Sequence, residues 1–93
     1  MTKVNLNADM AEGFGAYDIG DDTTMLKIVK SANVACGFHG GDANVMDRVC
    51  AAAKAEGISI GAHPGFNDLW GFGRRRISMS TREVEAMVAY QVG

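Results

Sequence analysis

The chain is poor in residues that cross-link or anchor a protein, with one proline, two cysteines and no long apolar run in 93 residues. Cys36 and Cys50 form no C-x-x-C pattern, and two cysteines provide no disulfide framework, so we expect both to be reduced thiols. No apolar run approaches the roughly 20 residues that a membrane-spanning helix needs. The N-terminal segment also lacks the apolar core of a signal peptide. We therefore expect a cytoplasmic protein with no membrane partner.

Charge of either sign is also limited. Asp and Glu number 11 and Lys and Arg number 9, which gives a formal net charge of −2. A general attraction to nucleic acid or to anionic lipid is therefore not expected. With 47% hydrophobic and 22% charged residues, the composition is typical of a soluble globular domain, and 93 residues allow only a small one.

Glycine, in contrast, is abundant, and its twelve residues cluster where apolar runs end. We expect strands over residues 3–8, 32–36 and 58–62, each followed by a glycine-rich loop. Stretches with helical periodicity come next, with Asp21 or Asp22, Asp42 and Ser80 as their N-caps. This β-α-β-α-β-α order predicts a parallel sheet with right-handed crossovers.

Three parallel strands do not close on themselves, and a (β/α) barrel typically needs about 250 residues. The sequence therefore predicts an α/β chain that forms the first part of a (β/α) barrel-like fold. We expect residues 1–93 to be a single partial domain of three βα units, truncated at its C-terminus. Such a sheet has open edges, and the association of copies into a homo-oligomer would cover them.

Ionisable side chains follow each expected strand. Because the carboxyl ends of parallel strands meet at one edge of the sheet, we expect these side chains to converge in one cleft, where ligands of α/β proteins bind. The residues concerned are Asp9, Glu12, His39, Asp42, His63 and Asp68.

Four of these residues are candidates for catalysis. Asp9 and Glu12 lie three residues apart in one turn, which suits acid–base chemistry or cation binding. His39 and His63 can act with them as a base and its orienting partner, or as metal ligands. The spacing of 24 residues between the histidines matches no compact zinc motif, so the metal content stays open. We take all four as the candidate catalytic residues.

Other polar side chains are candidates for substrate binding. Arg74 and Arg75 belong to the only basic cluster, and arginine forks grip carboxylate or phosphate, although such a run is more often a solvated surface. Asn7 is expected to orient a neighbour or the substrate, and Asp42 has an alternative purpose as a helix cap. The chain contains neither a P-loop nor a complete dinucleotide fingerprint, so any nucleotide would be held without a standard motif.

Six segments taken together resemble the N-terminal part of one known family. They are NLNAD (5–9), EGFG (12–15), SANVACGFH (31–39), GD (41–42), IGAHPG (60–65) and DLWGFGRR (68–75). In this order and spacing they resemble the LamB/YcsF family, the A component of prokaryotic 5-oxoprolinase. Small departures are visible, because the resemblance leads us to expect glycine at Ala11, alanine at Gly40 and proline at Ala43.

The resemblance implies a (β/α) barrel-like fold related to polysaccharide deacetylases. It implies ATP-dependent hydrolysis of 5-oxo-L-proline to L-glutamate, carried out with separate B and C subunits, with ATP used by the complex. The residues at family-like positions are Asp9, Glu12, His39, Asp42, His63 and Arg75. Members of this family continue for much longer, so catalytic groups from later strands would be missing from these 93 residues.

Two alternatives to the oxoprolinase hypothesis stay open at this point. The first is a metal-dependent deacetylase of carbohydrate or amide, with Asp9, His39 and His63 as the metal ligands. The second is an inactive fragment that folds only by oligomerising. Metal analysis would separate the first alternative from the oxoprolinase, and the mass in solution would decide the second.

Overall fold

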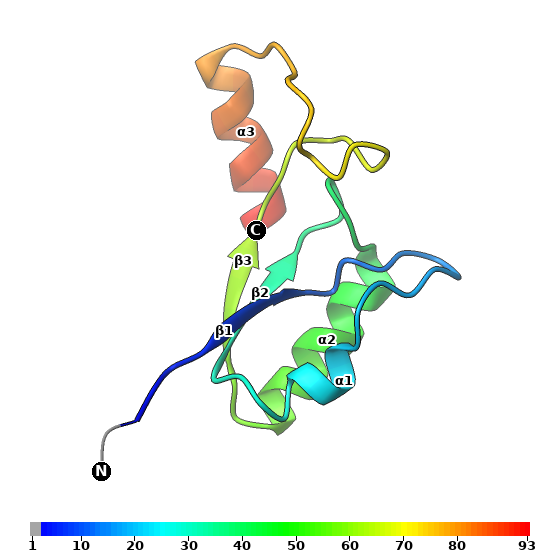
Figure 1. The fold of residues 1–93 in the computed structure, drawn as a ribbon. Helices are drawn as coiled ribbons and strands as arrows, with labels where there is room; N and C mark the ends of the chain where they lie inside the picture. The colour runs from blue at the N-terminus through cyan, green and yellow to red at the C-terminus, as the bar shows by residue number, and fades with distance from the viewer. Residues whose placement is uncertain (1–2) are drawn as a thin grey trace.

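The computed structural model describes residues 3–93 and contains three parallel strands and three helices (Figure 1). In chain order these are β1 (Asn7–Met10), α1 (Asp22–Met25), β2 (Ser31–Ala35), α2 (Ala43–Ala55), β3 (Ser59–His63) and α3 (Thr81–Val92). The strands lie in the order β1-β2-β3, and both neighbouring pairs are parallel. The predicted α/β class and the alternation of strands and helices are therefore confirmed.

The strand boundaries differ from the predicted ones. β1 begins at Asn7 rather than at residue 3, because its partner β2 begins at Ser31, which pairs with Asn7. β2 and β3 each lie one residue away from the expected positions, so His63 is the last residue of β3 and not the first residue of a loop. β1 and β3 are both edge strands, and the expected homo-oligomer stays a prediction.

The strand register separates an apolar face of the sheet from a polar one. Asp9 pairs with Asn33, which pairs with Gly61, and Ala35 pairs with His63. Since side chains alternate along a strand, these positions share one face together with Asn7. Met10, Ala32 and Val34 point to the opposite face and belong to the buried core.

Helices α1 and α2 supply the rest of that core. Val45, Val49 and Ala53 of α2 are buried in the same apolar cluster as Leu26 and Val29, which follow α1. Asp42 caps α2, because its Oδ1 accepts a hydrogen bond from the Val45 amide at 2.8 Å. Both cysteines are free thiols, as predicted. In the part of the chain that is described, no helix is both long and apolar enough to cross a membrane.

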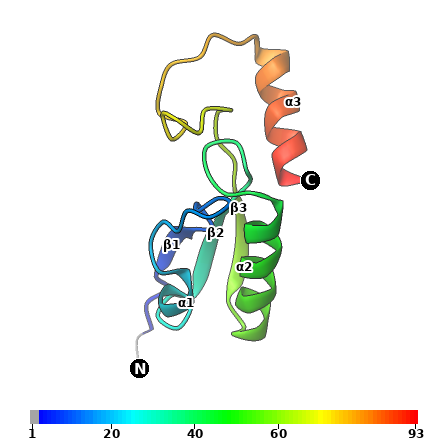
Figure 2. The same ribbon diagram turned by 90° about the vertical axis from the view of Figure 1, so that its right-hand side faces the viewer.

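Helix α3 lies apart from this core, beyond the carboxyl ends of the strands (Figure 2). The predicted capping box at its start is present: the Glu83 amide donates to Ser80 Oγ at 3.2 Å and the Ser80 amide donates to Glu83 Oε1 at 3.0 Å. At the other end, the buried Gln91 side chain bonds both the amide and the carbonyl of Gly65 at 2.9 Å. Gln91 thereby fastens α3 to the loop that follows His63.

Candidate functional site

An inner acidic–imidazole pair lies between the loops that follow β1 and β2. His39 Nε2 is 2.8 Å from Glu12 Oε2, and the two side chains are 4% and 13% exposed. The turn that places Glu12 depends on Ala11, whose φ of 62° lies in the left-handed region that glycine adopts most easily. Asp22 supports that turn by accepting the Ala11 amide at 3.1 Å, and burial raises the pKa of Asp22.

An outer pair lies on the polar face of the sheet. His63 Nδ1 at the end of β3 is 3.8 Å from Asp9 Oδ1 on β1, and the side chains are 30% and 52% exposed. Asn33 lies between them on β2 and donates Nδ2 to Asp9 Oδ1 at 3.1 Å and to Asn7 Oδ1 at 3.0 Å. The outer pair is therefore open to solvent, whereas the inner pair is not.

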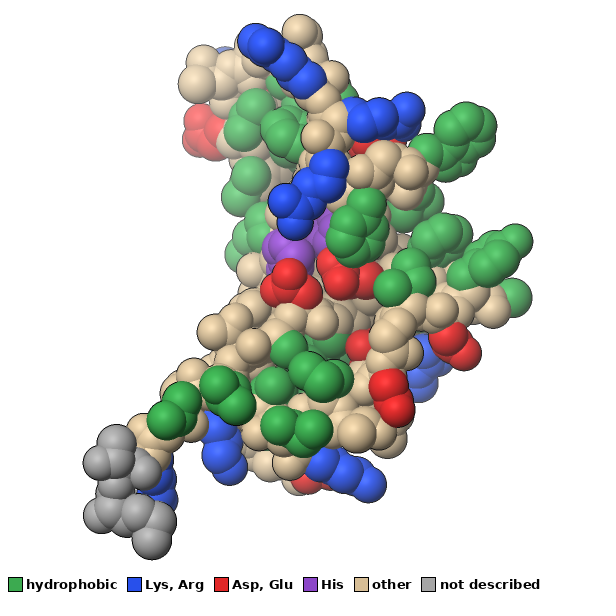
Figure 3. Space-filling model, viewed as in Figure 1, with side chains coloured by type: hydrophobic (Ala, Val, Ile, Leu, Met, Phe, Trp, Pro, Cys, Tyr) green, Lys and Arg blue, Asp and Glu red, His purple; other side chains and the backbone are tan. Residues whose placement is uncertain are grey.

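The two pairs touch through their imidazole rings. The ring centroids of His39 and His63 are 4.6 Å apart, and Glu12, His39 and His63 each offer a ligand atom within 4.8 Å of the others. Figure 3 shows the histidines beside acidic side chains and below a basic one. The predicted catalytic residues thus form one continuous series, in the order Glu12, His39, His63 and Asp9.

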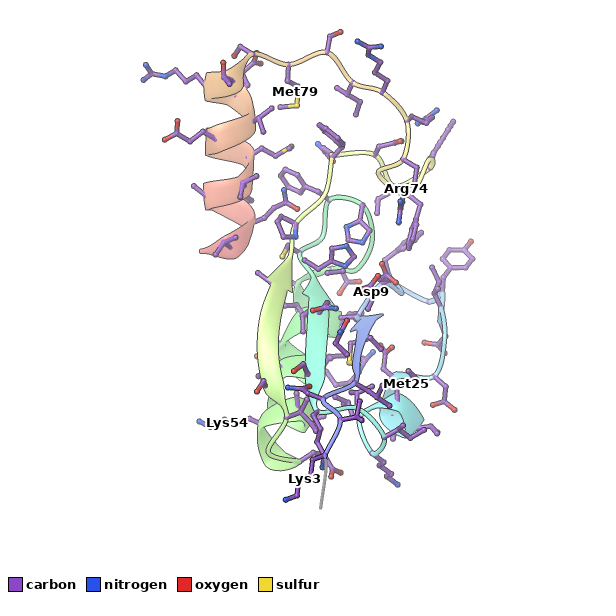
Figure 4. All side chains as sticks on the ribbon, turned by 60° about the vertical axis from the view of Figure 1, so that its left-hand side comes forward. Lys3, Asp9, Met25, Lys54, Arg74 and Met79 are labelled. Atoms are coloured by element: carbon purple, nitrogen blue, oxygen red, sulfur yellow. The ribbon has the colours of Figure 1, made fainter. Side chains whose placement is uncertain are left out.

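A cavity of about 400 Å³ opens next to both histidines. Its other walls are Pro64–Phe66 and Phe72–Arg74 from the long loop, and Val84, Met87 and Val88 from α3. Arg74 contributes to the lining, and Figure 4 shows Arg74 and Asp9 at the same end of the sheet. Ligand pockets usually measure about 300–1,000 Å³, so this cavity suits a small molecule.

Three predicted binding residues have internal partners instead. Arg75 forms an ion pair with the buried Asp68, whose Oδ2 accepts Arg75 Nε at 2.9 Å. One carboxylate oxygen of Asp42 accepts a hydrogen bond from the Val45 amide as a helix cap, and the other accepts one from the Gly15 amide at 2.7 Å. These hydrogen bonds lower the pKa of Asp42. Asn7 lies on the polar face but bonds Asn33. Of the predicted binding residues, only Arg74 lines the cavity.

The Asp68–Arg75 pair makes the long loop sensitive to strong acid. The hydrogen bond from Arg75 lowers the pKa of Asp68 from 3.8 to about 2. Because the pKa is lower in the folded chain, the stabilisation is fully present above pH 3.8 and is lost as the pH falls through about 2. The Gly71 amide, which donates to Asp68 Oδ1 at 3.0 Å, reports this step. We expect its NMR signal to titrate with a midpoint of about 2, and Asp68→Asn to abolish the titration. A midpoint at 3.8 in the wild type would show that the pair does not form.

Gln91 is a site-supporting residue that the sequence prediction missed. It occupies a position on the apolar stripe of α3 that runs through Val84 and Met87, where a polar side chain is unusual. That irregularity was the available signal, because a buried amide on an apolar stripe needs hydrogen-bond partners. Its partner, Gly65, lies 26 residues away and is not identifiable from periodicity.

Comparison with known proteins agrees with this architecture. A model of the LamB/YcsF family matches residues 4–93. The chain belongs to the LamB/YcsF family. It is similar to the 5-oxoprolinase A component of Azorhizobium caulinodans, with 54% identity over 93 residues that cover all of this chain and 37% of that protein. It is also 56% identical over 90 residues to the 5-oxoprolinase A component of Gluconobacter oxydans, covering 97% of this chain and 35% of that one.

A solved structure shows the same fold. The crystal structure of a lactam utilization protein from Thermus thermophilus matches with a TM-score of 0.92 and 50% identity, over 98% of this chain and 37% of that one. This confirms the prediction of a partial (β/α) barrel-like fold. The family resemblance and its restriction to the N-terminal portion are confirmed as well, since the chain spans little more than a third of these relatives.

Proposed function

We propose that this chain provides the N-terminal part of the A component of an ATP-dependent 5-oxoprolinase, which hydrolyses 5-oxo-L-proline to L-glutamate. The supporting observation is the site itself: two acidic–imidazole pairs meet beside a small cavity that Arg74 lines. The names of the relatives give the substrate class, because they are 5-oxoprolinase components and a lactam utilization protein. The B and C subunits and a cytoplasmic location belong to the same proposal.

The proposed reaction at this site is the hydrolysis of a stable cyclic amide. Phosphorylation of the amide oxygen by ATP creates a leaving group that the lactam itself lacks. ADP leaves, water adds to the activated carbon, and the ring C–N bond breaks as the ring nitrogen takes up a proton, which gives an acyl phosphate. A second water then hydrolyses the acyl phosphate to L-glutamate and inorganic phosphate. A side chain that accepts a proton from water and another that returns one to nitrogen are needed, and each typically contributes about 10²- to 10⁴-fold in rate.

The outer pair is the one placed to exchange those protons. Asp9 and His63 are partly exposed, and His63 lines the cavity. Asn33 orients Asp9 by donating to its Oδ1. Glu12 and His39 lie deeper, and the His39 ring packs against the His63 ring, which holds the His63 imidazole in place.

Arg74 is placed to bind the substrate carboxylate or a phosphate oxygen. It is the arginine of the basic cluster that lines the cavity, whereas Arg75 is bound to Asp68. A guanidinium fork matches a carboxylate or phosphate in two-point geometry. ATP itself is assigned to the complex of subunits, since the chain carries no standard nucleotide-binding motif.

Substrate binding and turnover test this function. We expect 5-oxo-L-proline to shift the imidazole NMR signals of His39 and His63 in a saturable manner, while L-proline, which lacks the ring carbonyl, does so far more weakly. In the presence of ATP and the B and C subunits, added chain should increase glutamate formation. Absence of both effects in a folded sample would contradict the proposal.

A further inference from the structure

We propose that Glu12, His39 and His63 bind one divalent transition-metal ion, for which Zn²⁺ is the representative. These residues come from three different loops or strand ends, yet each offers a ligand atom within 4.8 Å of the other two. Two imidazoles and one carboxylate are a ligand set that occurs in zinc sites with an open fourth position. Both histidines of the cluster line the cavity, so an open coordination position of the ion would face a molecule bound in that cavity.

The geometry of the cluster requires only small side-chain movements. Ligand bonds of about 2.1 Å in a tetrahedral site separate the ligand atoms by about 3.4 Å. His39 Nε2 and Glu12 Oε2 are 2.8 Å apart, so an ion between them would widen that gap slightly. The rings of His39 and His63 have centroids 4.6 Å apart and need to approach the ion by a rotation of the imidazoles.

Unpartnered nitrogens in the cluster bear on how easily the two imidazoles can turn. His39 Nδ1 and His63 Nδ1 are both buried, and neither has a hydrogen-bond partner among residues 3–93. The His39 side chain is only 4% exposed, so water reaches it poorly. Buried polar atoms without partners are costly and rare in proteins. The proposed ion lies on the Nε2 side of His39, next to Glu12, so it does not itself give the Nδ1 atoms a partner. The missing Nδ1 hydrogen bonds instead leave both rings free to rotate toward the ion.

The surrounding charges also favour a cation. Glu12 supplies one negative charge directly, and the Asp9 carboxylate lies 3.8 Å from His63 Nδ1. A carboxylate beside the second nitrogen of a ligating histidine fixes the ring and strengthens the ligand. Asp9 is therefore placed outside the ligand set, in contrast to the metal alternative drawn from the sequence, which had Asp9 in place of Glu12.

Metal binding at this cluster does not depend on 5-oxo-L-proline being the substrate. With the ion bound, His63 is a ligand and not a proton-exchanging group, so Asp9 keeps that role and the second group that the proposed reaction needs comes from elsewhere in the complex. The two proposals can therefore fail separately. Metal binding is measured without substrate or ATP, whereas the oxoprolinase proposal is measured by substrate binding and glutamate formation.

Zinc titration of matched variants tests the site. The chain, stripped with a chelator, is titrated with Zn²⁺ in competition with a chromophoric chelator, and Co²⁺ absorption reports the coordination geometry. We expect one Zn²⁺ per chain and an intense Co²⁺ spectrum typical of four-coordinate sites. Glu12→Gln and His63→Asn should weaken binding by more than about 100-fold, and Asp9→Asn, which removes only an outer-shell carboxylate, by about 10- to 100-fold.

Circular dichroism of each variant shows that it is folded before it is titrated. Failure of the folded wild-type chain to bind stoichiometric Zn²⁺ would overturn the proposal. So would unchanged affinity in both Glu12→Gln and His63→Asn. A loss in Asp9→Asn as large as that in Glu12→Gln would also contradict the proposed ligand set, because it would make Asp9 a ligand.

Discussion

Replacing His63 with alanine is expected to lower the turnover of 5-oxo-L-proline by about 10²- to 10⁴-fold in the assay with ATP and the B and C subunits. The imidazole of His63 lies between the outer carboxylate of Asp9 and the ring of His39, and it lines the cavity. Its removal separates the two pairs and takes away the imidazole that lies 3.8 Å from the Asp9 carboxylate. The rate of glutamate formation at saturating substrate is the quantity to measure.

Two comparisons make this result specific. Arg82→Ala on the exposed side of α3 is the control and should leave the rate within about twofold, because surface substitutions away from a site have small effects. His39→Ala is expected to lower the rate as well, because it leaves the Glu12 carboxylate without its partner at 2.8 Å. Unchanged rates in both histidine variants would remove these residues from the reaction.

Replacing Gly73 with alanine is expected to destabilise the folded chain by roughly 2 to 4 kcal/mol. Gly73 has a φ of +70°, and a Cβ added there would lie 2.7 Å from the His39 Cβ. Gly65 lies against the same imidazole, where an added Cβ would be 2.7 Å from His39 Nδ1. The long loop therefore encloses His39 with two glycines, and a methyl group displaces either the loop or the ring.

Gly57→Ala is a matched control for this substitution. Gly57 has nearly the same φ, +71°, but an added Cβ would meet nothing within 4 Å. The control carries only the backbone strain of about 1 kcal/mol, whereas Gly73→Ala adds the steric overlap. Urea unfolding monitored by circular dichroism gives both free energies of unfolding. Equal losses in the two variants would show that the loop does not pack on His39.

The convergence of the site was predictable because it follows from topology. Three apolar runs that each end before ionisable residues predict parallel strands whose carboxyl ends meet, and Asp9 and His63 lie where that rule places them. The pairing within the site was not predictable. Glu12 reaches His39 because the chain turns at Ala11 with a positive φ, which no periodicity indicates.

The arginine cluster shows a second limit of what the sequence alone can predict about the site. Arg74 and Arg75 are adjacent and chemically identical, yet one lines the cavity and the other binds Asp68. Their separation depends on the path of the loop from Pro64 to Met79, which has no regular secondary structure from which a direction follows. The family resemblance indicated Arg75 as a functional position, and the structure gives it a role in holding the loop.

The contact between the two imidazoles tests the central claim most directly, because the chain has only two histidines. Ring centroids 4.6 Å apart predict a strong nuclear Overhauser effect between the ring protons of His39 and His63 in the folded chain. Its observation would place the ends of β2 and β3 at one site. If the rings show no mutual effect in a sample whose backbone contacts report the parallel sheet, the two histidines do not share a site.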